Sequence, residues 1–508
     1  MQKLTQVFEK IMKNEKVPEE WESSFTIPIF KGKGDALQCE KYRGVRLLEH
    51  GMKIWEKILE ERLRRLIRID KCQFGFMKNK STTGAIYIMR QLQEKYGEKK
   101  RKLYHIFVDL EKAFDRVPRK AIEWALRRQG VPERLIVQVM ALYHNSHSRV
   151  RATAGVSANL EIRVGVHQGS ALSPLLFITV MEEATKEGRV GSPWELLYAD
   201  DLVLTAETRR EVEAKFERWK EKMQRRGLKV NMEKTKIMVT GKKATERVES
   251  GRWPCGCCGR GVGANSIKCT ECEKWCHRRC SGLRNLRNVE EFRCPACVRR
   301  GVDVRDEEEE VGELELEEVQ QFCYLGDMLD CEGGVERAVR ARVSAAWQKW
   351  REIASLLVNR DIDLVERGRV YEACIRPVLL YGAETWALTR RLEEVLIRTD
   401  RRMVRYMARV TWESGLSSEE VARECGLGGL EENLRRRRLR WFGHVKRREE
   451  DDVLKQVMLL EVEGRRPRGR PRKRWKTCVE GDMRELGVRE EDVEDREHWR
   501  RLIARLTP

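Results

Sequence analysis

The stretch ELLYADDLVL, residues 195–204, places two adjacent aspartates between two short apolar runs. ELLY and LVLT are too short for ordinary helices and predict strands, which a tight turn at Asp200 and Asp201 joins as a β-hairpin. A third run, LYHIFVDL (103–110), predicts another strand that ends near Asp109. If the three strands share a sheet, three carboxylates converge at its edge, and a cation is needed to relieve their repulsion. Mg²⁺ is expected because it prefers oxygen ligands. For the doublet alone, a plain polar turn is the alternative.

The charge of the chain indicates a polyanionic partner. With 102 Lys and Arg against 82 Asp and Glu, the net charge is +20, and clustered cations release counterions when they bind phosphates. Nucleic acid is the first expectation, although ribosomal and membrane-surface proteins share this balance. No segment approaches the roughly 20 apolar residues of a membrane span, and the N-terminus lacks an apolar signal region. We therefore expect a soluble, intracellular protein with no membrane partner.

Apolar periodicity predicts helices around these strands. Trp55, Leu59 and Leu63 recur at helical spacing within 51–69, opposite a basic face. Two further helices, at 118–129 and 132–143, have Pro near their starts, and a second long amphipathic helix is predicted for 335–357. A chain of 508 residues exceeds one hydrophobic core, so several domains are expected.

Nine of the 16 cysteines fall between Cys255 and Cys297, which indicates metal ligation in a reducing compartment. Their pairs, each with a gap of two residues, predict two closed tetrahedral zinc sites. The expected ligands are Cys255, Cys258, Cys269, Cys272, His277, Cys280, Cys294 and Cys297. Cys257 is a rival for Cys258, and Cys276 is left over. Because so short a segment has little core, zinc would supply most of its folding free energy.

The order of these ligands resembles a PHD finger. The interleaved topology of that family implies that the first and third pairs share one ion, and the second and fourth pairs share the other. Trp275 stands where PHD fingers place an aromatic residue around methylated lysine, with Trp253 and Phe292 as nearby aromatics. Histone tails are therefore candidate partners, and packing in a small core is the alternative role of Trp275.

Seven segments in a fixed order resemble the reverse transcriptase of non-LTR (LINE-type) retrotransposons. They are YRGVRLLEHGMKIWEKIL, QFGFMKNKSTTGAI, VDLEKAFDRV, VGVHQGSALSPLLF, LLYADDLVL, GLKVNMEKTKIM and FCYLGDML. The resemblance implies an α+β right-hand polymerase with fingers, palm and helical thumb. The PHD-like segment is then a surface insertion whose ends lie close together. The implied activity is RNA-directed DNA polymerisation, with an RNA template, a DNA primer and dNTPs as partners.

The resemblance also assigns roles to single residues. It makes Asp109, Asp200 and Asp201 the catalytic residues that hold two Mg²⁺ ions, which act on the attacking 3′-hydroxyl and the leaving pyrophosphate. Phe114 matches a steric gate against a ribose 2′-hydroxyl, with a core aromatic as the alternative. Asp115 is expected to hold structure. The other implied nucleotide-binding residues are Gln168 and Gly169 beneath the incoming nucleotide, Lys234 near the triphosphate, and Arg43 and Lys31 of the fingers.

The expected domain boundaries follow from these matches and from composition. They are fingers and palm (1–250), PHD-like double zinc finger (251–300), acidic linker (301–318), end of the palm with the primer grip (319–334), helical thumb (335–430) and a helical, basic nucleic-acid-binding C-terminal region (431–508).

Two basic stretches of the C-terminal region suggest contacts with nucleic acid. RPRGRPRKR (466–474) resembles an AT-hook, which implies that Arg468, Gly469, Arg470 and Pro471 lie in the minor groove of AT-rich DNA. A disordered, phosphate-binding tail is the alternative. RRRLRWFGH is consistent with a stacking surface or with a helix that buries Leu439 and Phe442.

The expected function is therefore an RNA-directed DNA polymerase of a non-LTR retrotransposon, acting in the nucleus. The alternative is a catalytically decayed retroelement product that binds chromatin or nucleic acid through its zinc finger. The intact aspartates favour the enzyme. Complete elements of this kind carry an upstream endonuclease, so we expect a truncated or mispredicted copy.

Overall fold

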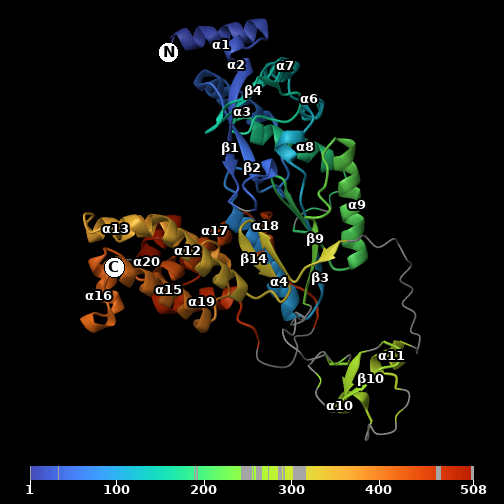
Figure 1. The fold of residues 1–508 in the computed structure, drawn as a ribbon, viewed down its shortest axis with the longest axis vertical. Coiled ribbons are helices and arrows are strands. Elements are labelled where there is room, and N and C mark those ends of the chain that lie inside the picture. The colour runs from blue at the N-terminus through green and yellow to red at the C-terminus, as the bar shows by residue number, and fades with distance from the viewer. Residues whose placement is uncertain are drawn as a thin grey trace. The chain divides into compact units, whose positions relative to one another are not determined.

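The computed structural model describes residues 2–504 except 33, 188, 190, 192, 242–254, 256, 259–261, 263–265, 273, 284–288, 290–291, 301–315 and 465–470. Two compact units result (Figure 1). The first combines Met1–Lys242 with Leu316–Pro508, and the second is Lys243–Glu315, which contains the cysteine segment.

A five-stranded sheet forms the centre of the first unit, in the order β12-β9-β3-β8-β7. Its middle strand β3 has antiparallel neighbours on both sides, and its apolar run is almost wholly buried. The hairpin predicted around the aspartate doublet is confirmed, since Tyr198 pairs with Asp201 across a two-residue turn. The strands are β3 (Leu103–Val108), β7 (Glu195–Tyr198), β8 (Asp201–Ala206), β9 (Lys236–Thr240) and β12 (Glu317–Glu318).

Helices cover this sheet. The helix α4 (Thr82–Glu98) contacts β7 and β9, and α9 (Arg209–Arg225) contacts β3 and β8. Most residues of α4 are buried, because other helices pack against its remaining faces. The helices predicted at 118–129 and 132–143 are confirmed, and each begins directly after its Pro. The smaller elements are α5 (Ala113–Arg116), α6 (Arg119–Arg128), α7 (Glu133–Ala141) and α8 (Ser173–Thr185).

A second sheet lies in the N-terminal part of this unit (Figure 1). Strand β1 pairs antiparallel with β2 and parallel with β4. The predicted amphipathic helix at 51–69 is confirmed as α3, which buries Trp55, Leu59 and Leu63. The elements are α1 (Gln2–Asn14), α2 (Glu19–Glu22), β1 (Ser23–Phe30), η1 (Cys39–Lys41), β2 (Tyr42–Leu47), α3 (His50–Leu66), β4 (His147–Ala152), β5 (Gly155–Val156) and β6 (Leu160–Glu161).

A helical bundle follows the short hairpin β13 (Gln321–Tyr324)–β14 (Asp327–Asp330). The helix predicted at 335–357 is confirmed as α12, and Trp350, Tyr371 and Leu396 lie in the core of the bundle. Its elements are α12 (Glu336–Leu357), α13 (Leu364–Cys374), α14 (Arg376–Leu379), η2 (Ala383–Thr385), α15 (Arg390–Ala408), η3 (Trp412–Ser414) and α16 (Ser418–Glu424).

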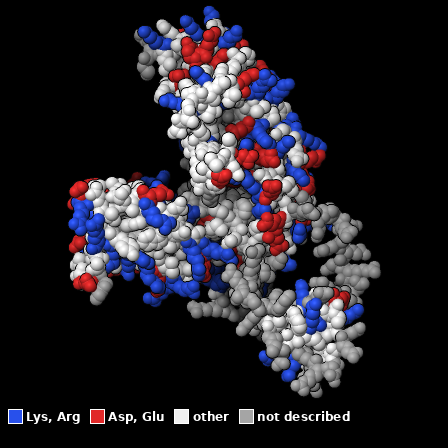
Figure 2. Space-filling model, viewed as in Figure 1, with Lys and Arg blue, Asp and Glu red and all other residues white. Residues whose placement is uncertain are grey.

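The basic C-terminal region is largely folded. Leu439, Trp441 and Phe442 of α17 are buried, which supports the helix with a buried face over a stacking surface. Trp475 packs against Tyr87 of α4 with a centroid distance of 4.9 Å. Figure 2 shows several groups of Lys and Arg side chains, with Asp and Glu among them, on the part of the molecule that holds the bundle. The helices of the C-terminal region are α17 (Leu430–Lys446), α18 (Val453–Leu459), α19 (Trp475–Leu486), η4 (Glu491–Val493) and α20 (Arg496–Ala504).

The acidic run predicted as a linker at 301–318 is only partly described. Residues 301–315 lie outside the described residues, but Glu317 and Glu318 form β12, which pairs in parallel with β9. Glu317 also forms an ion pair of 2.6 Å with Lys236. These last residues are exposed, as predicted, but they form the edge strand of the central sheet rather than a linker.

The second unit contains two short antiparallel strands, β10 (Ser266–Lys268) and β11 (Trp275–His277). They are accompanied by α10 (Arg278–Ser281) and α11 (Pro295–Arg300). Its core consists of cysteines and a few apolar residues. Across the described part of the whole chain, no helix has the length and apolar character needed to cross a bilayer.

Candidate functional site

The central sheet brings the three predicted aspartates to one edge. Asp109 directly follows β3, Asp200 lies in the β7–β8 turn, and Asp201 begins β8. Val108 pairs with Leu202, so the antiparallel register carried one residue further puts Asp109 opposite Asp201. Ala199, the first residue of the turn, has a φ of 59°, which turns the chain sharply just before the two carboxylates.

The carboxylates interact electrostatically. Burial raises the pKa of Asp200, the charge of Asp109 raises it further, and Arg43 opposes the shift. Asp201 keeps an exposed face, yet the protein packed around its carboxyl, together with the charges of Asp200 and Asp109, raises its pKa to about 6. Asp200 and Asp201 thus both resist ionisation, first because they are buried and then because like charges lie beside them.

The oxygen atoms of this edge suit a hard cation. Oδ2 of Asp109 is buried and accepts no hydrogen bond from the residues that the structure describes, although Nζ of Lys234 lies 3.6 Å away. Among the described residues, the three aspartates do not form a set whose ligand atoms all lie within 4.8 Å of one another. A cation bound by all three would therefore draw their side chains closer together.

A cavity of about 450 Å³ opens beside the aspartates. Its lining joins Asp109 and Asp201 to Lys234, which follows α9 in the chain, and to Phe322 and Tyr324 of β13. Phe322 stacks on Phe107 of β3 with a centroid distance of 4.0 Å, so the β13–β14 hairpin is fixed against the central sheet. The segment predicted as a primer grip thus lies beside the acidic edge.

Phe114 lies in the short helix α5, five residues after Asp109. Its half-buried ring stacks on Phe177 at 4.4 Å and meets the exposed ring of Phe76 edge-on at 6.2 Å. These contacts fix the ring, and they fit a gate as well as a partly packed aromatic.

The loop containing Gln168 and Gly169 is held against neighbouring segments. Nε2 of Gln168 donates to Oδ1 of Asp115 at 2.5 Å, so Asp115 has the positioning contact expected of a structural residue. Gly169 has a φ of 106°, and a Cβ atom there would lie 2.9 Å from the carbonyl oxygen of Arg46. Only glycine therefore fits this close approach without rearrangement.

The two residues predicted for the fingers, Arg43 and Lys31, differ in their contacts. Arg43 on β2 is exposed and acts electrostatically on Asp200. Lys31 follows β1, and its Nζ donates to the carbonyl of Glu40 at 2.8 Å. Among the described contacts, none joins Lys31 to the aspartates.

The second unit brings the eight expected zinc ligands together in two groups. The ligand atoms of Cys255, Cys258, His277 and Cys280 lie within 4.8 Å of one another, and so do those of Cys269, Cys272, Cys294 and Cys297. This grouping has the interleaved order of a PHD finger, and thiolate and imidazole ligands suit zinc. Cys257 remains a rival, since it forms a third group with Cys255 and Cys276.

The remaining predicted contacts are only partly described. Phe292 is buried in the core of the second unit, so it is not available to surround a ligand, and Trp275 is half-buried. Trp253 lies outside the described residues, as do Arg468, Gly469 and Arg470 of the AT-hook-like segment. Pro471 is described and exposed.

Sequence reasoning missed Gln73 and Gly75, which contact the aspartate turn. Oε1 of Gln73 accepts a hydrogen bond of 2.9 Å from the backbone N–H of Ala199. The glycine within QFGF was the available signal, because a glycine beside a strand suggests a close approach of two backbones.

Comparison with known proteins adds a family match. Residues 30–326 match the family model described as "Reverse transcriptase (RNA-dependent DNA polymerase)". The chain is 27% identical over 258 residues to the "Retrovirus-related Pol polyprotein from type-1 retrotransposable element R2" of Nasonia vitripennis, covering 48% of this chain and 25% of that protein. It is 21% identical over 396 residues to the "Probable RNA-directed DNA polymerase from transposon BS" of Drosophila melanogaster, covering 76% of this chain and 38% of that protein. The chain thus spans well under half the length of these relatives.

Among solved structures, a telomerase from Candida Tropicalis in complex with a fragment of telomeric RNA is 12% identical. The superposition covers 90% of this chain and 68% of that one, with a TM-score of 0.35. At that score the description of the fold rests on the strand pairing given above.

Proposed function

Because the chain belongs to the reverse transcriptase (RNA-dependent DNA polymerase) family, we propose that it is the RNA-directed DNA polymerase of a non-LTR retrotransposon. It extends a DNA 3′-hydroxyl on an RNA template. The observation that carries the proposal is the acidic edge of the central sheet, where Asp109 meets the turn of Asp200 and Asp201 beside a cavity. Oδ2 of Asp109 is buried and accepts no hydrogen bond from the described residues, which supports a role in binding a cation.

In this proposal Asp109, Asp200 and Asp201 hold two Mg²⁺ ions. The ions, when bound, neutralise phosphate charge and activate the attacking hydroxyl. The three carboxylates themselves fix where the primer end and the nucleotide meet, because they project from one rigid edge of the sheet rather than from a mobile loop.

Other side chains act on the nucleotide. The fixed ring of Phe114 excludes a ribose 2′-hydroxyl, and the backbone of Gln168 and Gly169 supports the incoming dNTP from below. Lys234, whose Nζ lies 3.6 Å from Oδ2 of Asp109, gives a proton to pyrophosphate as it leaves. Arg43 and Lys31 contribute positive charge toward the phosphates.

The basic surface of the helical region supports contacts with the template and primer (Figure 2). Clustered Lys and Arg bind phosphates through counterion release. AT-rich DNA for the segment at 468–471 and histone tails for the second unit remain further proposals, as does a nuclear site of action. The second unit holds two structural zinc ions.

The proposal is tested by primer extension with purified protein, an RNA template, a DNA primer and Mg²⁺. We expect extension by the wild type and its loss in Asp200→Asn, because the amide cannot neutralise a cation. Asp361→Asn removes an exposed carboxylate between α12 and α13 and is the matched control, with activity unchanged. Extension that persists in Asp200→Asn would contradict the site, and an inactive wild type that binds nucleic acid would favour the decayed scaffold.

A further inference from the structure

The loop Cys72–Phe76 lies directly against the turn that carries the aspartates. Gln73 is 2% exposed, and its Oε1 accepts from the N–H of Ala199 at 2.9 Å and from the N–H of Gly75 at 2.8 Å. On either side, Phe74 N–H donates to the Leu197 carbonyl at 2.7 Å and Leu197 N–H donates to the Cys72 carbonyl at 3.0 Å. The loop thus pairs with the last part of β7 and ends on the turn.

The turn needs such support. Ala199 has a φ of 59°, in a region that non-glycine residues rarely occupy unless their surroundings hold them there. The approach of the two backbones is close, since a Cβ atom on Gly75 would lie 2.4 Å from the nitrogen of Ala199. The side-chain carbonyl of Gln73 and the backbone of Gly75 therefore both contact Ala199, the residue just before Asp200.

We propose that Gln73 is a positioning residue for catalysis. Its amide carbonyl fixes the backbone of Ala199, and with it the directions in which Asp200 and Asp201 leave the turn. This inference rests on the proposed polymerase function. It differs from the roles assigned above because Gln73 acts through the turn and contacts neither nucleotide nor ion.

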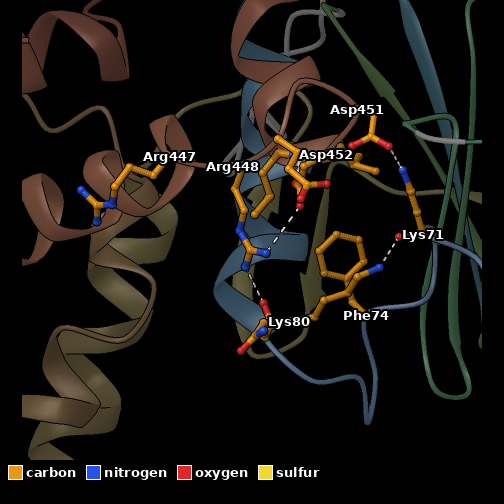
Figure 3. Close-up of a pocket in the computed structure, with 11 residues that line it drawn as sticks. Lys71, Phe74, Lys80, Arg447, Arg448, Asp451 and Asp452 are labelled. Atoms are coloured by element: carbon orange, nitrogen blue, oxygen red, sulfur yellow. Dashed lines mark hydrogen bonds and ion pairs between the residues drawn. The ribbon is translucent and has the colours of Figure 1, made fainter. Parts of the chain in front are cut away.

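The far side of the same loop is held by the corner between α17 and α18 (Figure 3). A cavity of about 330 Å³ separates them, with Phe74 on one wall. Lys71 pairs with Asp451, Arg448 donates to the carbonyl of Asn79 at 2.6 Å, and Nζ of Lys80 lies 4.8 Å from the ring centroid of Phe74. These three cationic side chains are already in contact with protein groups between the two segments. They therefore hold the loop in place rather than offer charges to a ligand.

The test compares three variants of the full chain. Gln73→Met keeps the length of the side chain but removes the acceptor, whereas Gln73→Glu keeps an oxygen that can accept both hydrogen bonds. Gln138→Met removes another buried glutamine, 1% exposed on α7, and is the control. Single-nucleotide incorporation gives kcat and the KM for dNTP, and hydrogen exchange of the peptide 195–204 reports the Ala199 amide without requiring activity.

We expect kcat to fall about 10- to 100-fold in Gln73→Met, because small misplacement of reacting groups is costly. The KM for dNTP should change little, since Phe114 and Gln168 lie on other segments. Exchange at 195–204 should quicken in Gln73→Met but stay slow in Gln73→Glu, which keeps the acceptor oxygen. The kcat of Gln73→Glu should recover only in part, because its carboxyl adds a charge beside the aspartates.

Three outcomes would overturn the inference. Gln73→Met could incorporate nucleotide at the wild-type rate, or Gln138→Met could lose as much kcat as Gln73→Met. Alternatively, hydrogen exchange of the peptide 195–204 could be the same in Gln73→Met as in the wild type. An inactive wild type would remove the proposed function, whereas the exchange experiment would still decide whether Gln73 holds the turn.

Discussion

At the scale of the residue, packing fixes the ring of Phe114, which is proposed to select the nucleotide. Its ring is stacked on Phe177 and is only half-buried. One face is therefore fixed by the protein and the rest is free to meet a substrate. A rigid group placed where a competing substrate carries an extra atom discriminates by steric clash.

Phe114→Ala should lower the preference for dNTP over rNTP by about 10-fold or more, because the clash with the 2′-hydroxyl is removed. Incorporation kinetics with both nucleotide types measure this ratio. Phe114→Tyr keeps the ring and should keep the preference. An equal loss with dNTP and rNTP in Phe114→Ala would instead indicate a packing role.

Glu56 on α3 is a buried carboxyl that the folded protein keeps partly neutral. Burial raises its pKa to about 7, even though the N–H of Ala171 donates to its Oε2 at 3.2 Å. Its usual pKa is 4.5. Below that value both the folded and the unfolded chain bind the proton, whereas above it the unfolded chain loses the proton first. The contribution of Glu56 to stability is therefore lost as the pH rises from 4.5 to about 7.

Glu56→Gln should raise the free energy of unfolding relative to the wild type at pH 8, with little difference near pH 4.5. The gain is up to about 3 kcal/mol, at 1.36 kcal/mol for each unit of pKa shift. Urea unfolding at several pH values measures it. Glu61→Gln, exposed on the same helix, should leave the pH dependence as it is. A gain that is equal at all pH values would exclude titration of Glu56 as its cause.

At the scale of the element, a buried ion pair joins α4 to the β13–β14 hairpin. Nε of Arg90 donates to Oδ2 of Asp327 at 2.8 Å, and both side chains are almost fully buried. Nη2 of Arg90 also donates to the carbonyl of Met328, and the indole of Trp386 donates to Asp327. The pair thus ties the central helix, the hairpin beside the aspartates and the helical bundle together.

Arg90→Met should destabilise the first unit by about 3–5 kcal/mol, because it leaves the Asp327 charge buried without its partner. Adding Asp327→Asn should recover part of the loss. The free energies come from urea unfolding followed by tryptophan fluorescence. Arg340→Met removes an exposed pair with Glu336, and its effect should stay near 0.5 kcal/mol. If the double variant lost the sum of both single losses, the two side chains would not be coupled.

At the scale of the whole molecule, the second unit enters and leaves the first at the edge of the central sheet. β9 precedes it and β12, the next described strand of that sheet, follows it, and the two strands pair in parallel. With Glu317 opposite Lys236, the end of β9 at Thr240 and the start of β12 at Glu317 lie about 13 Å apart along the strands, at about 3.3 Å for each residue. The sheet is therefore complete without the residues between them.

Replacing 243–315 by about eight Gly and Ser residues, whose r.m.s. span is about 15 Å, should leave the first unit folded and its primer extension intact. The full chain should bind about two zinc ions and the shortened chain none, as elemental analysis can measure. Loss of zinc without loss of folding would agree with the division into units. Collapse of the shortened chain, or zinc that persists in it, would contradict this division.

The sequence predicted the local features of the site well. The hairpin at Asp200 and Asp201 and the strand ending at Asp109 follow from residue spacing, because neighbouring residues decide turns and strands. The grouping of the eight expected zinc ligands was implied by the resemblance to a PHD finger, and the structure brings them together in that grouping. Glu317 and Glu318 were missed as a strand, since their acidic composition is typical of a linker while β9 provides the partner that makes them pair. Trp441 and Phe442 could be assigned to a buried face only once α17 was packed.

By itself, the sequence determined the order of the motifs, the elements that carry the aspartates and the chemistry of the two candidate metal centres. Only the tertiary structure decided which distant segments hold those elements in place. Gln73 meets Ala199 across 126 residues, and Arg90 meets Asp327 across 237. In neither pair does the local sequence of one residue predict its partner. Such contacts depend on the packing of the whole sheet and its helices rather than on the periodicity of one segment.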